Sequence, residues 1–355
     1  MGTSAVRIAG AGLSGLSTAI GLARLGHRVE VFEKNADSGM LRHADWDAIE
    51  NWTTEQDFFA SSSQWGIMPT FEYRAPLSFE VYNAKGECQV VALRQPLFYL
   101  VSRGSQADSV EQALKAQALD LGVRIYYNQT CNLGEVDVWA TGARSASFFL
   151  GAGLTFRTSH SDIVMVLVDA FLAPKAYAYL VIVDGFATLS TVLTRDFNQA
   201  RTYLNRCMQA FRQYKSFDIH DLKMSSGFGG RVSAVWKPIT QPLVVGEAGG
   251  FQDFLWGFGI RHALHTGHLA ARALDQGLDY EQVVNREIRP FVRASLLNRA
   301  FYDLAGNRTY RILIRYFVSR PNLRRHLHRF YRGPILERIF RPLVERRYRS
   351  ADDRM

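Results

Sequence analysis

A glycine-rich loop near the start of the chain has the composition and spacing of a nucleotide-binding turn. Its residues are Gly10, Ala11, Gly12, Leu13, Ser14 and Gly15. In such a loop, the first glycine permits a tight turn, the second lets the backbone approach a pyrophosphate, and the third lets a helix and a strand pack closely. The helix that follows presents free N–H groups and the positive end of its dipole to the phosphates.

The elements expected on either side of this loop are those that nucleotide binding by such a loop requires. Residues 6–9 form an apolar run, and residues 16–25 carry apolar side chains at helical spacing. Gly26 ends this helix, and a second apolar run ends at Glu33. In dinucleotide-binding folds, an acidic residue about 20 positions after the glycines accepts hydrogen bonds from ribose hydroxyls. The sequence therefore predicts a Rossmann-type unit that binds a dinucleotide.

Two later segments also run from an apolar strand into small residues. The first, residues 138–140, ends at Thr141 and Gly142. The second begins with the apolar residues 243–245, passes through a longer glycine loop and continues as a helix. Its distinctive positions are Gly246, Glu247, Gly257, Gly259 and Ile260, where the helix begins.

Together, the three segments resemble the geranylgeranyl-reductase and aromatic-hydroxylase superfamily of flavoproteins, which bind a single FAD in a glutathione-reductase-type fold. The resemblance covers about half of the chain. Residues 248–251 and 257–261 look closer to the geranylgeranyl-reductase branch, because the hydroxylase branch usually carries a proline in this loop. No proline occurs between Gly246 and Gly259, and Glu247 stands where the family usually has aspartate.

The resemblance implies FAD as the cofactor, held by all the glycine-loop and strand-end positions named above. An arginine in the position of Arg103, which follows a strand, often lies over the flavin or pyrophosphate in this family; a solvated turn arginine is the alternative. Arg42 lies in a loop that could fold back onto the cofactor. Because only one dinucleotide fingerprint is present, NAD(P)H or a protein electron donor is expected to act as a transient reductant.

The expected fold class is α/β, with an inserted antiparallel-sheet substrate domain and a helical C-terminal region. The FAD-binding domain would combine residues 1–45, 90–155 and 230–290. Residues 46–89 and 156–229 would form the substrate domain, in which residues 163–194 read as three antiparallel strands and residues 196–214 as a helix. The C-terminal region would cover residues 291–355.

The positive charge of the chain is concentrated at its C-terminal end. The net charge is +9, but residues 286–355 hold 18 arginines against 6 acidic residues, so this part carries +12 and the remainder −3. The stretch from residue 320 onward mixes arginine with apolar residues, and positions 335, 336, 339, 340 and 343 share one helix face. A packed helical cap and peripheral membrane contact are both compatible with this pattern. Nucleic-acid binding is not expected, because nothing besides charge supports it.

The composition of the chain argues against several other classes of protein. Three scattered cysteines argue against a disulfide framework or a zinc site, and no apolar run approaches the roughly 18 residues of a membrane span. The N-terminus enters the first strand directly, so no signal peptide is expected. We therefore expect a cytoplasmic protein, peripheral at most on the inner face of the membrane. No metal site is expected, although His262, His265 and His268 share one helix.

The residues leave three reaction classes open. No catalytic residues can be assigned. Aromatic residues crowd positions 46–82, which favours an apolar pocket and an isoprenoid, polyene or other lipid-like substrate. The favoured class is reduction or dehydrogenation of carbon–carbon double bonds by hydride transfer through the flavin. Flavin-dependent monooxygenation of an apolar or aromatic substrate is the first alternative, and a non-redox cyclase of the lycopene-cyclase kind is the second. The Trp-x-Trp-x-Ile-Pro signature of flavin halogenases is absent.

Overall fold

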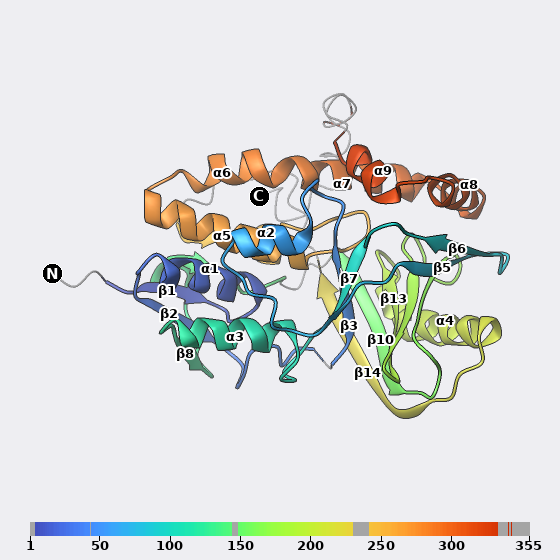
Figure 1. Cartoon of the computed structure of the whole chain (residues 1–355), viewed down its shortest axis with the longest axis horizontal. Helices are drawn as coiled ribbons and strands as arrows, with labels where there is room; N and C mark the ends of the chain where they lie inside the picture. The colour runs from blue at the N-terminus through green and yellow to red at the C-terminus, as the bar shows by residue number, and fades with distance from the viewer. Residues whose placement is uncertain are drawn as a thin grey trace.

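A parallel sheet forms the first layer of the molecule. The computed structural model describes residues 4–42, 44–143, 148–229, 241–332, 340 and 342. Five parallel strands lie in the order β15-β9-β1-β2-β8. Figure 1 labels β1, β2 and β8 of this sheet. Their bounds are Val6–Ala9 (β1), Val29–Glu33 (β2), Arg124–Tyr127 (β8), Val138–Trp139 (β9) and Leu243–Val244 (β15). The strand order reverses at β1, and ligands of open parallel sheets bind outside the carboxyl ends of the strands at such a switch point.

Three helices pack on this sheet or on each other, and close approach depends on glycine. They are α1 (Leu13–Arg24), α3 (Val110–Asp120) and α5 (Ile260–Gln276). A Cβ on Gly267 of α5 would lie 2.5 Å from the carbonyl oxygen of Ser14, and one on Gly21 would lie 2.7 Å from the Ala271 Cβ. The Ser17 hydroxyl donates to the carbonyl of Leu264 across the same contact. Helices α1 and α5 are therefore held side by side along these turns.

A second, mainly antiparallel sheet lies beside the first (Figure 1). Seven strands run in the order β14-β10-β13-β12-β11-β5-β6, and only β5 and β11 pair in parallel. Their bounds are Ser78–Asn83 (β5), Cys88–Ala92 (β6), Phe149–Arg157 (β10), Ile163–Val168 (β11), Ala178–Val183 (β12), Phe186–Leu193 (β13) and His220–Gly229 (β14). Helix α4 (Ala200–Tyr214), preceded by the 3-10 turn Phe197–Gln199, packs its apolar side on one face of this sheet. The strands and helix predicted over residues 163–214 are confirmed.

A small three-stranded sheet joins the two layers. It consists of β3 (Trp46–Glu50), β4 (Tyr73–Arg74) and β7 (Phe98–Ser102), and α2 (Phe58–Gln64) lies between β3 and β4 in the chain. Because β3 pairs with β7, strands from the predicted substrate and FAD-binding segments belong to one sheet. Likewise, β10 begins inside the predicted FAD-binding segment 90–155 but pairs within the antiparallel sheet. The boundaries drawn from the sequence stay a prediction.

The C-terminal part of the chain is helical as far as it is described. It contains α6 (Tyr280–Glu287), α7 (Arg289–Leu304), α8 (Asn307–Val318) and α9 (Leu323–Phe330), and α8 and α9 lie above the antiparallel sheet (Figure 1). Of the predicted apolar face at 335–343, only Phe340 has a described side chain, and its ring lies 5.6 Å from that of Phe301. Across the described ranges, no helix combines the length and apolarity needed to cross a bilayer.

Candidate flavin site and the adjoining cavity

The first glycine loop has the shape that its sequence predicts. Gly10 has φ +103°, and a Cβ there would lie 2.5 Å from the carbonyl oxygen of Ala140. A Cβ on Gly15 would lie 1.9 Å from the carbonyl oxygen of Gly10, so these two glycines are required for folding. Gly12 differs, because a Cβ there would meet nothing within 4 Å. The second glycine of the fingerprint thus opens onto free space above the loop, where a pyrophosphate would pass.

The first turn of α1 is available to an anion. Gly12 is the N-cap and gives the helix no side-chain cap, so no side chain occupies the positive end of the helix dipole. Leu13 and Ser14 begin the helix and are buried. A Cβ on Gly246 would lie 2.6 Å from the Ser14 hydroxyl, which brings the second glycine loop against the first. The two predicted loops therefore converge at the sheet's switch point.

Glu33 lies at the carboxyl end of β2 and is only 8% exposed. Its Oε2 accepts from the backbone N–H of Ala11 at 2.9 Å, and its Oε1 accepts from the backbone and side-chain nitrogens of Asn35. The Glu33 carboxylate thus holds the glycine loop in place through its hydrogen bond to Ala11. Oε2 retains a lone pair, as a ribose contact requires.

The second glycine loop leads to another uncapped helix. Gly246 has φ +61° and Gly257 has φ +85°, backbone conformations that side chains disfavour. The 3-10 turn Gly246–Gly249 follows β15, and Gly259 is the N-cap of α5 without a side-chain cap. Burial raises the pKa of Glu247, although Arg42 and Arg103 oppose the shift. The positive end of the α5 dipole lies next to Glu247, since a Cβ on the N-cap Gly259 would lie 3.3 Å from the Glu247 Oε1.

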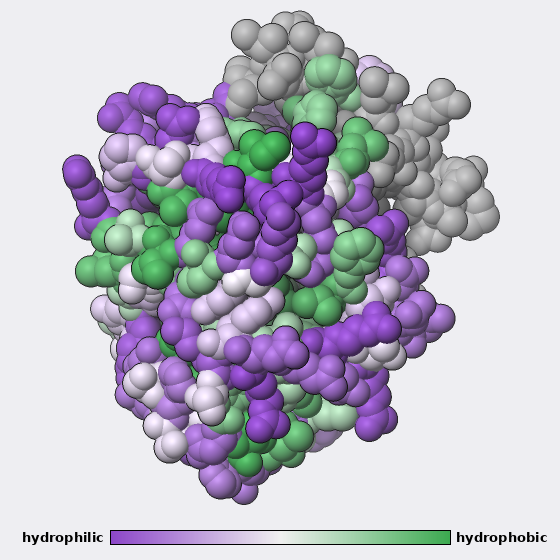
Figure 2. Space-filling view, turned by 90° about the vertical axis from the view of Figure 1, so that its right-hand side faces the viewer, coloured by the Kyte–Doolittle hydropathy of each residue, from purple (hydrophilic) through white to green (hydrophobic). Residues whose placement is uncertain are grey.

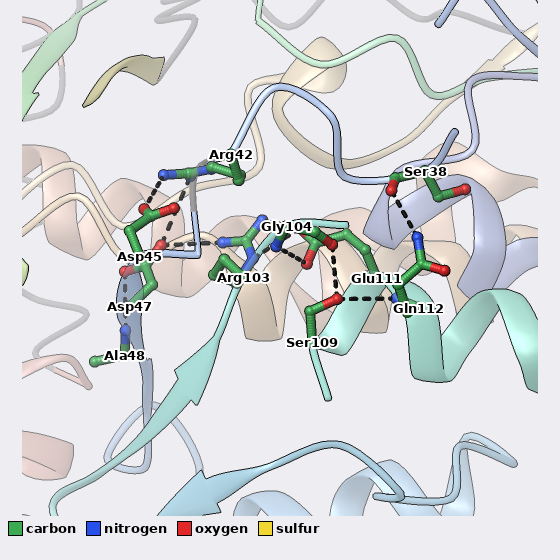
Figure 3. A network of polar contacts seen from close by, with 10 residues as sticks. All are labelled: Ser38, Arg42, Asp45, Asp47, Ala48, Arg103, Gly104, Ser109, Glu111 and Gln112. Atoms are coloured by element: carbon green, nitrogen blue, oxygen red, sulfur yellow. Dashed lines mark hydrogen bonds and ion pairs between the residues drawn. The ribbon is translucent and has the colours of Figure 1, made fainter. Parts of the chain in front are cut away.

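Arg42 and Arg103 belong to one chain of ion pairs (Figure 3). The Arg42 guanidinium lies 3.1 Å from Asp45 and 3.6 Å from Asp47. Arg103, which is 7% exposed, lies 3.0 Å from the same Asp47 and 2.7 Å from Glu111 of α3. Burial opposes the charge on both arginines, but these carboxylates outweigh it and raise both pKa values. The network holds the loop before β3 against the end of β7.

A cavity of about 120 Å³ lies between this loop and the antiparallel sheet. Arg42, Asp45 and Asp47 line one side. Glycines of two neighbouring strands line the other side, where Gly151 of β10 pairs with Gly227 of β14. A Cβ on Gly227 would lie 3.6 Å from the Arg42 Nη1, so the bare backbone lets the charged loop approach the sheet.

Aromatic and polar side chains close the rest of the cavity. Tyr177, Tyr179 and Trp256 form an aromatic side, and the Tyr177 hydroxyl donates to the carbonyl of Trp256 at 2.6 Å. Glu247 and Gln252 of the second glycine loop also line the cavity. Residues of this loop and residues of the antiparallel sheet thus share one cavity.

The structure brings most predicted site residues to this region. The glycine loops, Glu33, Arg42 and Glu247 surround the switch point or the cavity, whereas Arg103 is buried behind Asp47 and does not line the cavity. Thr141 and Gly142 follow β9, and Thr141 is exposed. None of these positions is shown to contact a cofactor, so their roles stay predictions.

Sequence reasoning missed the carboxylates Asp45 and Asp47 and the cavity residues Tyr177 and Tyr179. The alternating carboxylates on either side of Trp46 were the available signal, because alternation in a strand directs both to one face. The tyrosines reach the cavity only through the pairing of distant strands, which no local pattern reveals.

The three histidines of α5 have separate surroundings. His262 is 4% exposed, with its Nδ1 3.6 Å from Glu50, while the His265 ring stacks on Trp65 at 4.7 Å. Within the described ranges, no group of three or more side chains has a metal-binding arrangement.

Comparison with known proteins supports the fold and the first glycine loop. Residues 8–45 match the family described as NAD(P)-binding Rossmann-like domain. No curated protein sequence matches the chain. A geranylgeranyl bacteriochlorophyll reductase-like protein from Thermoplasma acidophilum has a similar structure, with a TM-score of 0.70 and 15% identity over 96% of this chain and 98% of that one.

Two further solved structures share the architecture along nearly their whole length. A flavin-dependent brominase aligns with a TM-score of 0.63 and 15% identity over 96% of this chain and 98% of that one. A flavoprotein/dehydrogenase from Cytophaga hutchinsonii aligns with a TM-score of 0.63 and 12% identity over 97% of this chain and 96% of that one. The fold is thus that of FAD-dependent oxidoreductases of the geranylgeranyl-reductase and hydroxylase type, as the motifs indicated.

Proposed function

We propose that the protein is an FAD-dependent oxidoreductase that binds an apolar substrate between the flavin and the antiparallel sheet. The observation that carries the proposal is the cavity at which the second glycine loop meets the sheet. The residues present suit FAD: the space above Gly12 is open, and α1 and α5 begin without side-chain caps. Bound FAD would supply the hydride chemistry.

In this proposal each part of the site has a distinct task. The first turn of α1 and Gly12 would bind the pyrophosphate, and Glu33 would bind the adenosine ribose. The start of α5 would favour negative charge on the nearby edge of the flavin, as preorganised dipoles do in other enzymes. The electron donor would be NAD(P)H or a protein, bound transiently.

The aromatic residues of the cavity support the apolar part of the proposed substrate, and its charged residues, such as Arg42 and Asp47, would face a polar group on that substrate. Tyr177, Tyr179 and Trp256 offer an aromatic surface, and Gly151 and Gly227 leave a flat stretch of backbone against which a planar or extended molecule can lie. We propose a carbon–carbon double bond of an isoprenoid, polyene or other lipid-like molecule as the reacting group.

Hydroxylation is the second candidate, because the same cavity holds Asp45, Asp47 and Ser190, which suit an oxygen-bearing substrate.

The experiment that tests the proposed function has two stages. First, purified protein should be yellow and release one flavin per chain on denaturation; a colourless protein that binds only NAD would overturn the proposal. Second, a mass change of +2 in the product identifies reduction, +16 with oxygen consumption identifies hydroxylation, and no change identifies cyclisation.

A further inference from the structure

Residues 253–258 of the second glycine loop are held in place by the C-terminal helices. The Phe254 N–H donates to the Ser295 hydroxyl at 2.9 Å, and Arg299 donates to the carbonyl of Leu255 at 3.2 Å. Both partners lie on α7, and both are fully buried. The C-terminal region therefore contacts the very loop that leads into α5.

Asp253 organises this loop from within. Its Oδ1 accepts from the backbone N–H of Leu255 at 2.8 Å, and its backbone N–H and carbonyl bond to Phe258 and Gly257. Its Oδ2 accepts from the hydroxyl of Tyr331 at 2.7 Å. Asp253 is 1% exposed and Tyr331 is 2% exposed, so this hydrogen bond is shielded from water. A bond to an ionised carboxylate is about twice as strong as a neutral one.

A second contact couples Tyr331 to the same loop. The Trp52 ring packs edge-on against Phe258 at 5.0 Å and lies 6.5 Å from the Tyr331 ring. His328 of α9 bonds to the carbonyl of Trp52 at 3.0 Å. The end of α9 thus reaches Asp253 directly and Phe258 through Trp52.

We propose that Tyr331 is a positioning residue for the flavin, which keeps residues 253–259 in the FAD-binding shape through its hydrogen bond to Asp253. This inference rests on the proposed binding of FAD. It assigns the end of α9 a task in the cofactor site, although Tyr331 lies 78 residues further along the chain than Asp253.

The hydrogen bond matters most when Asp253 carries its charge. Burial raises the pKa of Asp253 to about 6, while the Tyr331 hydroxyl, the loop N–H groups and Arg299 oppose that shift. Tyr177 and Glu50 also face Asp253. Above about pH 6 the loop must hold a buried carboxylate, and loss of the Tyr331 hydroxyl leaves that charge one donor short. Below this pH the Asp253 carboxyl is neutral, so loss of the Tyr331 hydroxyl affects the loop little.

The test measures the FAD dissociation constant of the full chain at pH 8 and pH 5, by flavin fluorescence. Relative to wild type, Tyr331→Phe should weaken FAD binding about tenfold or more at pH 8 and only about twofold at pH 5. The matched control is Tyr280→Phe, which also removes a buried hydroxyl, one that donates to the Val244 carbonyl at 3.2 Å. Because that acceptor does not titrate, the ratio of the FAD dissociation constants of Tyr280→Phe and wild type should be equal at both pH values.

Glu50 titrates in a similar range, so a second background separates the two carboxyls. Burial raises the pKa of Glu50 to about 7. In Asp253→Asn, which keeps Glu50, the Tyr331→Phe ratio should become the same at pH 8 and pH 5. Equal ratios for Tyr331→Phe in the wild-type background would overturn the inference while FAD binding stands. Failure of the wild type to bind FAD at either pH would overturn the proposed function and this inference with it.

Discussion

At the scale of single residues, the glycine loops separate folding from binding. Gly10 and Gly15 have no room for a side chain, whereas Gly12 has φ −85° and open space above it. Gly10 and Gly15 therefore serve the fold, and Gly12 can serve a ligand. A substitution at Gly12 therefore tests binding without a steric clash inside the protein.

We expect Gly12→Ala to fold normally and to lose most of its bound FAD, because the new methyl group points into the space proposed for the pyrophosphate. Flavin content after purification and the melting temperature report the two effects. Gly134→Ala is the control, since a Cβ there also meets nothing within 4 Å but lies in a surface turn. Full FAD occupancy in Gly12→Ala would show that the pyrophosphate lies elsewhere.

Glu33→Ala should weaken FAD binding at least tenfold, because each charge-assisted hydrogen bond contributes roughly 1.5–3 kcal/mol. The redox potential of the flavin should change little, since the ribose lies far from the isoalloxazine. The variant should also unfold more easily, because Ala11 and Asn35 lose their acceptor. Titration calorimetry measures the affinity, and an unchanged dissociation constant would place the ribose contact elsewhere.

Glu50 gives a pH prediction for folding stability. It is fully buried, and one of its oxygens has no hydrogen-bond partner within the described ranges. An acid whose pKa is raised in the folded state stabilises the fold below its unfolded value of 4.5 and loses that contribution as the pH rises through about 7.

Glu50→Gln should therefore gain stability relative to wild type between pH 5 and pH 8, by up to about 3 kcal/mol. Urea unfolding at several pH values measures this difference. Glu55→Gln is the control, because that side chain is 79% exposed and should show no such trend. A constant difference between Glu50→Gln and wild type across this range would contradict the assignment.

At the scale of elements, the pairing of α1 with α5 sets the distance between the two glycine loops. Gly267→Ala would place a methyl group 2.5 Å from the Ser14 carbonyl and 2.8 Å from the Ser17 Cβ. Overpacking of this kind costs about 1–3 kcal/mol. Because Ser14 lies in the first turn of α1, FAD affinity should fall together with the melting temperature. Loss of stability with unchanged affinity would mean that the helix ends move independently of this contact.

At the scale of the whole molecule, exposed apolar side chains lie at the end of α7, on α8 and in the loop after β11. Phe171 is 76% exposed, Leu304 74% and Ile312 62%. A hydrogen bond of 2.7 Å from the Ala170 N–H to Asn307 brings the Phe171 loop to α8. Figure 2 shows that hydrophobic patches on the face viewed there are separated by hydrophilic side chains. Contact with a membrane would thus depend on arginine as well as on apolar residues.

We propose peripheral, salt-sensitive binding to anionic membranes through this surface, since each near-surface arginine gains about 1 kcal/mol from anionic lipid. Vesicle sedimentation at low and high salt tests it, with neutral vesicles for comparison. Phe171→Ser combined with Leu304→Ser should reduce binding severalfold, whereas Leu133→Ser, which removes an exposed leucine from a turn before β9, should not. A wild-type chain that stays in solution with anionic vesicles at low salt would refute the proposal.

The sequence by itself determined the Rossmann-type unit at the start of the chain. Spacing at Gly10, Gly12 and Gly15, with Glu33 at the end of the next strand, reflects local geometry that a short segment specifies. The strands of residues 163–194 follow from β-branched and aromatic runs between turn residues, and the helix up to residue 214 follows from helical spacing, for the same reason. Each of these features depends on neighbours within about 25 residues.

Only the tertiary structure decided which distant side chains share a site. Asp47 meets Arg103 across 56 residues, and Tyr331 meets Asp253 across 78. Arg103 has the sequence context of a cofactor residue, yet burial beside Glu111 and Asp47 made it part of an ion-pair network. The partners of a buried charge are set by the packing of whole elements, because the charge must be satisfied wherever the fold places it. No local pattern carries that information.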